Sequence, residues 1–383
     1  MDAIVNQVKE NHINQFGQVA QVYRSPGRIN IIGEHTDYND GFVLPGAIDR
    51  YVYVGISKRS DKTIKLYSVN FEETIVSAID RLEVQSAQWA SYVLGVCQLM
   101  AKELPHGFEM TIYGDIPVGA GLSSSAALES AIGYGLNELF DLKYNRMQLA
   151  KIGQQCEHQF IGVRCGIMDQ FASLHGIENK VMKLDCRSLD YTYFPLELGA
   201  YEFVLLNTKV SHSLASTAYN DRRAQCESAV ARLQVRYPHV QSLRDASVEM
   251  LNDAVPDQKE QSYIKARFVI EEIQRVSMVC DFLQAGNLEA VGKEMYATHQ
   301  GLKEMYQVSC EELDYLVDAV QDFPEVLGAR MMGGGFGGCT LNLVKTSFVD
   351  EMIAKVSAGY QTTFGIALES YVVRLSHGTA PVS

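Results

Sequence analysis

Hydrophobic and polar positions follow two different periods along the first half of the chain. It begins with an amphipathic segment whose apolar positions are Val5, Val8, Ile13 and Phe16. Alternating apolar, β-branched and aromatic residues then predict extended segments at residues 21–24, 29–32, 51–57 and 63–69. Apolar positions at helical spacing, from Trp89 to Met100, predict a helix over residues 88–103 with one buried face. Alternation returns at residues 108–112, and Ile116-Pro117 ends that strand.

The second half is richer in helices. A helix is predicted up to Phe140, and another begins at Asn145, a plausible N-cap, with Leu149, Ile152, Cys156 and Phe160 on its inner face. Strands are predicted at residues 181–185, 191–194 and 203–206, and residues 217–319 are mostly helical. The remainder predicts two strands joined by a loop over residues 327–345, a helix at 347–360 and a strand at 368–375. Because 383 residues exceed what one hydrophobic core usually serves, we expect two domains, 1–195 and 196–383.

Composition and charge exclude several classes of protein. Apolar residues make up 47% of the chain, which is typical of a globular protein. The net charge of −13 repels phosphate backbones and anionic lipid, so we expect neither nucleic acid nor a membrane as partner. The eight cysteines form no C-x-x-C pair, which favours free thiols in a reducing compartment. With no secretory leader and no apolar run of ~20 residues, the sequence predicts a cytoplasmic protein.

Residues 117–127, PVGAGLSSSAA, lie between a predicted strand and a predicted helix. Glycines let the backbone bend so that amide groups converge, and the helix that follows presents its positive dipole end to the same loop. The serine hydroxyls can bind phosphate oxygens or Mg2+. The alternative is a tight turn with serine N-caps. We favour the phosphate interpretation, although the chain lacks the G-x-x-x-x-G-K-[ST] loop and the protein-kinase motifs.

Residues 27–41, GRINIIGEHTDYNDG, place a short apolar strand before a loop that is dense in hydrogen-bonding groups. Such density suits a ligand with many hydroxyl groups. A solvated polar turn is the alternative for Asn39, Asp40 and Gly41 taken alone.

Residues 331–339, MMGGGFGGC, contain G-x-G-x-x-G, but they lie near the C-terminus between strand signals and do not open a βαβ domain. We therefore expect a loop that packs against a ligand or against the phosphate-binding segment. A plain glycine hairpin is the alternative that the residues leave open.

These three segments resemble the signature motifs of the GHMP kinase superfamily, and GRINIIGEHTDYNDGFVLPGAI is similar to the hallmark of its galactokinase branch. The motifs stand in family order, and residues 157–170 resemble the segment that supplies the catalytic aspartate. One departure is Gly46, where many relatives would have cysteine. The resemblance implies a fold of two α+β domains, an N-terminal unit like ribosomal protein S5 domain 2 and a ferredoxin-like C-terminal unit. The implied reaction is transfer of phosphate from ATP to the anomeric hydroxyl of galactose, giving galactose 1-phosphate, the first committed step of the Leloir pathway.

The resemblance also implies a role for each site residue. It places Asp169 at the anomeric hydroxyl with Arg28 beside it. Sugar hydroxyls would be bound by Glu34, His35, Thr36, Asp37 and Tyr219. The phosphates of ATP would be wrapped by Gly119, Ala120, Gly121, Leu122, Ser123, Ser124 and Ser125. Mg2+ would be held by Ser125 and Glu157. A neighbouring arginine stabilises a charged carboxylate and weakens it as a base, so proton abstraction and simple orientation of the hydroxyl both stay open for Asp169.

Other functions on the same scaffold are a kinase for N-acetylgalactosamine, arabinose or mevalonate, or a non-catalytic sensor of galactose and ATP. The intact run from Ser123 to Ala127 favours an enzyme over the sensor, and the GEHTDYNDG string argues against mevalonate. We expect a monomer.

Overall fold

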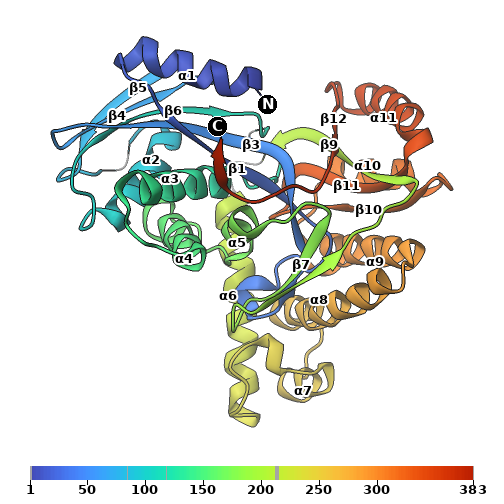
Figure 1. The fold of residues 1–383 in the computed structure, drawn as a ribbon. Helices are drawn as coiled ribbons and strands as arrows, with labels where there is room; N and C mark the ends of the chain where they lie inside the picture. Colours follow the sequence, from blue (N-terminus) through green and yellow to red (C-terminus); the bar gives the residue numbers. More distant parts are fainter. Residues whose placement is uncertain (1, 84, 118, 212–214, 383) are drawn as a thin grey trace.

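A six-stranded mixed sheet forms the N-terminal part of the molecule. The computed structural model describes residues 2–83, 85–117, 119–211 and 215–382. The strand order is β13-β1-β3-β6-β4-β5. Their bounds are β1 Gln21–Asn30, β3 Pro45–Lys58, β4 Thr63–Ser68, β5 Glu73–Ala78, β6 Phe108–Gly114 and β13 Ala380–Val382. β13 pairs with β1, so the end of the chain returns to the N-terminal sheet (Figure 1).

Four helices cover one face of this sheet, and a fifth covers the other (Figure 1). The four are α2 Gln88–Met100, α3 Ser124–Phe140, α4 Arg146–Cys156 and α5 Met168–His175, with a π-helical turn at Glu157–Ile161 after α4. On the other face, α1 Asp2–Phe16 buries Val5, Val8 and His12. Ile13 is 45% exposed, so the predicted apolar face of this helix was wrong at that position.

The C-terminal part is a four-stranded antiparallel sheet with its own helices. The order is β10-β11-β9-β12, with β9 Tyr201–Ser211, β10 Val326–Met331, β11 Gly337–Lys345 and β12 Glu369–Val373. α10 Glu311–Gln321 and α11 Val349–Phe364 share a core with this sheet, and α9 Leu288–Gln300 packs against β10.

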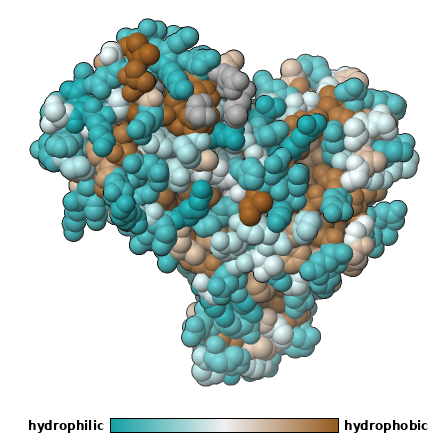
Figure 2. All heavy atoms as spheres, viewed as in Figure 1, coloured by the Kyte–Doolittle hydropathy of each residue, from teal (hydrophilic) through white to brown (hydrophobic). Residues whose placement is uncertain are grey.

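Three further helices and a small sheet complete the fold. α6 Ala215–Arg236, α7 Val248–Ala254 and α8 Gln261–Gln284 form a separate core, and α6 and α7 project from the body of the molecule (Figure 1). A three-stranded sheet joins β2 Phe42–Val43, β7 Lys180–Asp185 and β8 Tyr191–Pro195. The face shown in Figure 2 is largely hydrophilic, and a notch separates its two upper lobes.

The elements confirm most of the sequence pattern, with informative differences. The predicted segments 21–24 and 29–32 are one strand, β1, interrupted by a bulge between Pro26 and Arg28. Strands β2, β5 and β13 and helix α5 were not predicted. The Asn145 N-cap is confirmed as a capping box with Gln148. A Cβ on Gly46 would lie 2.5 Å from Leu375, so the returning C-terminal segment explains why glycine stands there.

The domain boundary near residue 195 stays a prediction. In the described ranges, no helix is long and apolar enough to cross a membrane. Val118, within the predicted phosphate-binding segment, lies outside the described residues.

Candidate active site

Arg28 and Asp169 form a hydrogen-bonded pair at the centre of the site. The Nε of Arg28 donates to Oδ1 of Asp169 at 2.9 Å, and Nη2 donates to Oδ2 at 3.2 Å. Arg28 is buried and follows the bulge in β1, whereas Asp169 lies in the first turn of α5 with its side chain 34% exposed. The bulge directs the side chain of Arg28 toward the first turn of α5, which is more than a hundred residues away in the sequence. The two hydrogen bonds then form a bidentate pair between Arg28 and Asp169.

The same arginine is bonded to the segment predicted to wrap the phosphates. Its Nη1 donates to the Gly121 carbonyl at 2.5 Å, and its amide donates to the Leu122 carbonyl at 3.1 Å. Ser123, at φ 61°, directs its hydroxyl to Oδ2 of Asp169 at 2.5 Å and makes no N-cap bond. The alternative of serine N-caps is therefore wrong for Ser123.

The loop itself has the backbone of an anion-binding turn. Gly119 and Gly121 both have φ of 74°, which favours glycine. Within the described part of the loop, the amides of Gly119, Gly121 and Leu122 donate no hydrogen bond, and α3 begins immediately afterwards. Unpaired amides at a helix start are the donors that phosphate groups require.

Ser125 and Glu157 lie together beside this loop. Burial raises the pKa of Glu157 to about 7, against a hydrogen bond from Ser125 that lowers it. A hydroxyl and one carboxylate are a sparse donor set, and the described residues hold no cluster of three or more His, Cys, Asp or Glu that could bind a metal. Such a set fits Mg2+, which completes its coordination with substrate phosphates and water.

The loop after β1 brings Glu34 into the same cavity. Glu34 is 2% exposed and forms an ion pair with Arg330, which is completely buried on β10. The Gly333 amide donates to Oε1 of Glu34 at 3.0 Å. Burial alone would raise the pKa of Glu34, but Arg330 and Arg28 hold that pKa below its usual value.

His35 is held among aromatic rings. Its Nδ1 is 2.8 Å from the Tyr38 hydroxyl, and its ring centroid is 4.7 Å from that of Tyr306 and 5.3 Å from that of Tyr219. Burial lowers the pKa of His35 to about 4, so the ring is neutral near pH 7. Nε2 is buried without a hydrogen-bond partner in the described chain, which leaves one ring nitrogen for a ligand.

Asp37 faces Asp169 across the cavity, and no arginine, lysine or histidine of the described residues forms an ion pair with it. Burial and the charge of Asp169 raise the pKa of Asp37 to about 7, while the amides of Tyr38 and Met168 oppose the rise. A Cβ on Gly166 would lie 1.9 Å from Oδ2 of Asp37, so this close packing requires glycine.

One predicted sugar-binding residue points elsewhere. The Thr36 hydroxyl lies 2.8 Å from the Gly33 carbonyl and 2.6 Å from that of Phe42, and Thr36 does not line the cavity. The structure brings the other predicted sugar-binding residues, Glu34, His35, Asp37 and Tyr219, to one cavity with Asp169 and Arg28.

The glycine-rich loop between β10 and β11 closes the site. A Cβ on Gly333 would lie 3.1 Å from the Gly121 carbonyl oxygen, and one on Gly338 would lie 3.1 Å from Ala120. The prediction that this segment packs against the segment predicted to bind phosphate is confirmed for the contact itself. The loop joins two antiparallel strands and no helix follows it directly. It is therefore not a dinucleotide-binding turn, in agreement with the prediction from the sequence.

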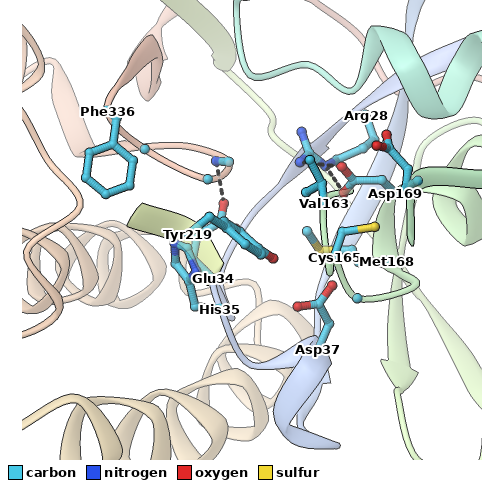
Figure 3. Close-up of a pocket in the computed structure, with 15 residues that line it drawn as sticks. Arg28, Glu34, His35, Asp37, Val163, Cys165, Met168, Asp169, Tyr219 and Phe336 are labelled. Carbon is cyan, nitrogen blue, oxygen red and sulfur yellow. Dashed lines mark hydrogen bonds and ion pairs between the residues drawn. The ribbon is translucent and has the colours of Figure 1, made fainter. Parts of the chain in front are cut away.

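The cavity has a volume of about 300 Å3 and opens to solvent. Arg28 and Asp169 lie on one side, Glu34, His35 and Tyr219 lie on the other, and Asp37 lies below them (Figure 3). Arg28 is the only arginine or lysine among the described lining residues. A second cavity of about 600 Å3 lies along Pro117 and Gly119 and reaches Lys209 of β9.

Sequence reasoning missed three buried ionisable residues that support the site. Arg330 binds Glu34, and Glu272 of α8 accepts the Gly33 amide at 2.9 Å. Glu129 of α3 accepts from Gln170, next to Asp169, at 3.0 Å. The available signal was a charged residue at an apolar position of a strand or helix, which is rare unless the charge is paired.

Comparison with known families defines the class of protein. The models "GHMP kinases N terminal domain" and "GHMP kinases C terminal" match residues 91–177 and 280–361. A mevalonate kinase structure from Methanococcus jannaschii, 16% identical, has the same fold, with a TM-score of 0.66 over 94% of this chain and 99% of that one. The fold is that of a GHMP kinase.

Closer relatives narrow the class further. The model "Galactokinase galactose-binding signature" matches residues 10–58. A galactokinase of Exiguobacterium sibiricum is 42% identical over 96% of both chains, and that of Clostridium acetobutylicum is 38% identical over 99% of this chain and 100% of its own. The structure of Lactococcus lactis galactokinase complexed with galactose is 37% identical and superposes with a TM-score of 0.95, covering 99% of this chain and all of the other. The chain belongs to the galactokinase family, and the predicted family and two-domain α+β fold are confirmed.

Proposed function

We propose that this galactokinase, which phosphorylates galactose with ATP, transfers the γ-phosphoryl group to the anomeric hydroxyl of the sugar. The observation that carries the proposal is the position of the Arg28–Asp169 pair. It is bonded to the phosphate-binding loop through Gly121 and Ser123, and it lines the same cavity as Glu34 and Asp37. The pair therefore lies where a phosphate and a sugar would meet.

On the sugar side, hydrogen-bonding groups of different kinds surround the cavity. Ionised Glu34 accepts hydrogen bonds, neutral His35 offers Nε2, and Tyr219 offers a hydroxyl with an apolar ring. A hexose presents hydroxyl donors on its edge and C–H groups on its faces, so carboxylates and aromatic rings suit it. We assign Glu34, His35, Asp37 and Tyr219 to the sugar.

On the phosphate side, we assign the segment from Gly119 to Ser124 to the triphosphate, with the unpaired amides of Gly119, Gly121 and Leu122 as donors. Mg2+ would be held by Ser125 and Glu157, where it would neutralise charge on the phosphate oxygens and lower the pKa of the buried Glu157 carboxyl. Arg28 supplies the positive charge that the protein itself brings to the transferred group.

The chemistry needs little covalent participation from the protein. The sugar oxygen attacks the γ-phosphorus, the bond to the β,γ-bridging oxygen breaks, ADP leaves, and the hydroxyl proton passes to Asp169 or to water. The transition state is loose, so the proton leaves late, and orientation and charge neutralisation contribute most of the catalysis. Both oxygens of Asp169 already accept hydrogen bonds from Arg28 and Ser123, which favours orientation of the hydroxyl as its first role.

An ADP-release assay tests the proposal directly. ATP and Mg2+ are supplied with galactose, N-acetylgalactosamine, arabinose, glucose or mevalonate, and the product from galactose is identified by 31P and 13C NMR. We expect the highest kcat/KM with galactose and phosphate on C1. A preference for another sugar, phosphate on another carbon, or sugar binding without ADP release would each overturn the assignment.

A further inference from the structure

The Glu34–Arg330 ion pair joins the sugar-binding loop to the C-terminal sheet. Arg330 is 0% exposed and Glu34 is 2% exposed. Nη2 of Arg330 also donates to the Asn30 carbonyl at 2.9 Å, at the end of β1. One guanidinium nitrogen therefore anchors both the strand that leads into the sugar-binding loop and the carboxylate on that loop.

The two oxygens of Glu34 are not equivalent. Arg330 and the Gly333 amide both donate to Oε1. Across the described residues, no hydrogen bond reaches Oε2, and Glu34 lines the cavity. The clamp on Oε1 thus fixes the rotation of the carboxylate and leaves Oε2 for a ligand.

Two buried donors of Arg330 lower the stability of the fold. Its Nε and Nη1 are buried and have no hydrogen-bond partner in the described structure. An apolar residue often serves stability as well as a buried ion pair does, and unsatisfied buried donors add a further penalty. Stability alone therefore does not explain an arginine at this position.

We propose that Arg330 is a positioning residue for sugar recognition, which keeps Glu34 charged and aims its Oε2 at one hydroxyl of galactose. This inference rests on the proposed function. It adds a residue that never touches the substrate to the set that determines which sugar binds.

Several titratable and polar groups face Glu34, and they define what Arg330 contributes. Arg28 and neutral His35 lie nearby, the Gly333 amide donates to the carboxylate, and Asp37 titrates near pH 7 across the cavity. Burial raises the pKa of Glu34 and so opposes its ionisation. Among the groups that lower this pKa, Arg330 has the largest effect. Without Arg330, Glu34 should take up a proton nearer neutral pH and lose its preference for a hydroxyl donor.

A site built around a charged acceptor rejects a sugar that lacks the matching hydroxyl. The test therefore uses isothermal titration of galactose and its 2-, 3-, 4- and 6-deoxy analogues, without ATP, on wild type, Glu34→Gln, Arg330→Gln and the double variant. Binding is measured at pH 6 and pH 8, and kcat for galactose is measured on the same proteins with ATP and Mg2+. Arg59→Gln is the matched control, because it removes another ion pair to a buried glutamate, Glu109, outside the site.

We expect Arg330→Gln to weaken galactose binding about 10–100-fold at pH 6, the loss typical of a hydrogen bond to a charged group, and less at pH 8. It should lose discrimination at the same deoxy position as Glu34→Gln, with kcat changed less than about threefold, as for binding that is equal in ground and transition states. In the double variant the pH dependence introduced by Arg330→Gln should vanish. Arg330→Lys, which keeps the charge, should restore pH independence relative to wild type. Asp37 titrates near pH 7 in wild type and in each variant. Each affinity is therefore compared as a ratio to that of wild type at the same pH.

Equal losses for galactose and all deoxy analogues at both pH values would overturn the inference, since they indicate a general structural role. If Arg330→Gln fails to fold, the inference is tested by the ratio of galactose affinities between wild type and Glu34→Gln. A constant ratio from pH 5 to pH 8 supports a permanently charged Glu34, and a ratio that falls toward one below pH 7 contradicts it. Failure of the proposed function is distinguishable, because wild type itself would then not bind galactose.

Discussion

The phosphate side and the sugar side of the cavity are built from different parts of the chain. On the phosphate side, backbone amides, two glycines with positive φ and short hydroxyl side chains form the surface. On the sugar side, long side chains form it, and each is held by others: Glu34 by Arg330, and His35 by Tyr38 and by the rings of Tyr219 and Tyr306.

The difference follows from the two ligands. A triphosphate is a dense anion that amides and a helix start can bind without a particular side chain. A sugar differs from its isomers only in the direction of its hydroxyls, so its recognition requires acceptors fixed in rotation as well as in position. We therefore expect substitutions on the phosphate side to change kcat and those on the sugar side to change KM and specificity.

Asp169→Asn should have the largest effect, because Asp169 lies where the two sides meet. The asparagine amide has one accepting oxygen and no charge, so it can neither orient the sugar hydroxyl as the carboxylate does nor accept its proton. We expect kcat to fall about 10^3-fold, within the range for loss of a group that acts on the transferred proton. Galactose binding, measured by titration without ATP, should remain detectable. Asp257→Asn, at an exposed carboxylate, is the control. Near-normal kcat for Asp169→Asn would contradict its position at the reacting hydroxyl.

Asp37→Asn separates recognition from stability on the sugar side. Loss of the charged acceptor should raise the galactose KM about tenfold at pH 8, as expected for a hydrogen bond to a charged group. The pKa of about 7 lies above the usual value for aspartate, so the folded protein holds this proton more tightly than the unfolded chain does. Stability therefore falls as pH rises toward 7 and stays low above it.

The asparagine variant lacks that penalty. We expect its melting temperature without ligand to exceed that of wild type by about 2 °C at pH 8, and the difference to shrink toward pH 4. Differential scanning calorimetry across this range measures it. Glu34→Gln should behave in the opposite way and lower stability, because it leaves Arg330 buried without a counter-ion. A gain in stability for both variants would show that Glu34 and Asp37 are not electrostatically different.

Ser123→Ala and Ser125→Ala should divide the phosphate side into two functions. Ser123 is bonded to Asp169, so its loss should lower kcat about tenfold, as for one hydrogen bond to a charged group, without changing the Mg2+ requirement. The Ser125 hydroxyl lowers the pKa of Glu157, which places it near the proposed Mg2+ site, so its loss should raise the Mg2+ concentration needed for half-maximal rate. Titration of the rate with Mg2+ at saturating ATP checks both, and equal Mg2+ curves for the two variants would contradict the division.

The sequence predicted the parts of the site that depend on short-range sequence patterns. A glycine turn before a helix and a dense polar loop after a strand each have a short-range cause, and the structure has both. The direction of Ser123 was not predictable, because it depends on a positive φ and on an aspartate 46 residues away. Arg330 was missed for a similar reason: it reads as one charge in an apolar strand, and its partner is 296 residues distant.

The fold shows the same limit. Helices with a regular apolar face, such as α2 and α4, were predicted within a few residues of their ends. β13 has three residues and forms only because β1 offers it an edge, so nothing in its own pattern indicates a strand. β5 is an edge strand with exposed positions such as Val76, which weakens the alternation.

Thr36 provides the smallest expected effect on recognition, and it tests whether the whole sugar-binding loop contacts the ligand. Its hydroxyl has one proton to share between the carbonyls of Gly33 and Phe42, and its own carbonyl accepts from the amides of Asn39 and Gly41. These bonds close the loop on itself, so we expect Thr36 to determine the shape of the loop and its neighbours to be the residues that contact the sugar. Thr36→Ser keeps the hydroxyl and its hydrogen bonds. The free energy of unfolding should stay close to that of wild type, and the galactose KM should stay within about threefold of it.

Thr36→Val removes the hydroxyl and leaves two carbonyls without this donor, which should cost about 1–3 kcal/mol of unfolding free energy. Urea denaturation measures that loss, and initial rates at varied galactose measure KM on the same samples. If Thr36 shapes the loop, stability falls while the ratio of kcat/KM for galactose to that for its deoxy analogues is unchanged. Unchanged stability together with selective loss of one deoxy discrimination would instead place the hydroxyl on the sugar, and the loop would then be a continuous recognition surface from Glu34 to Asp37.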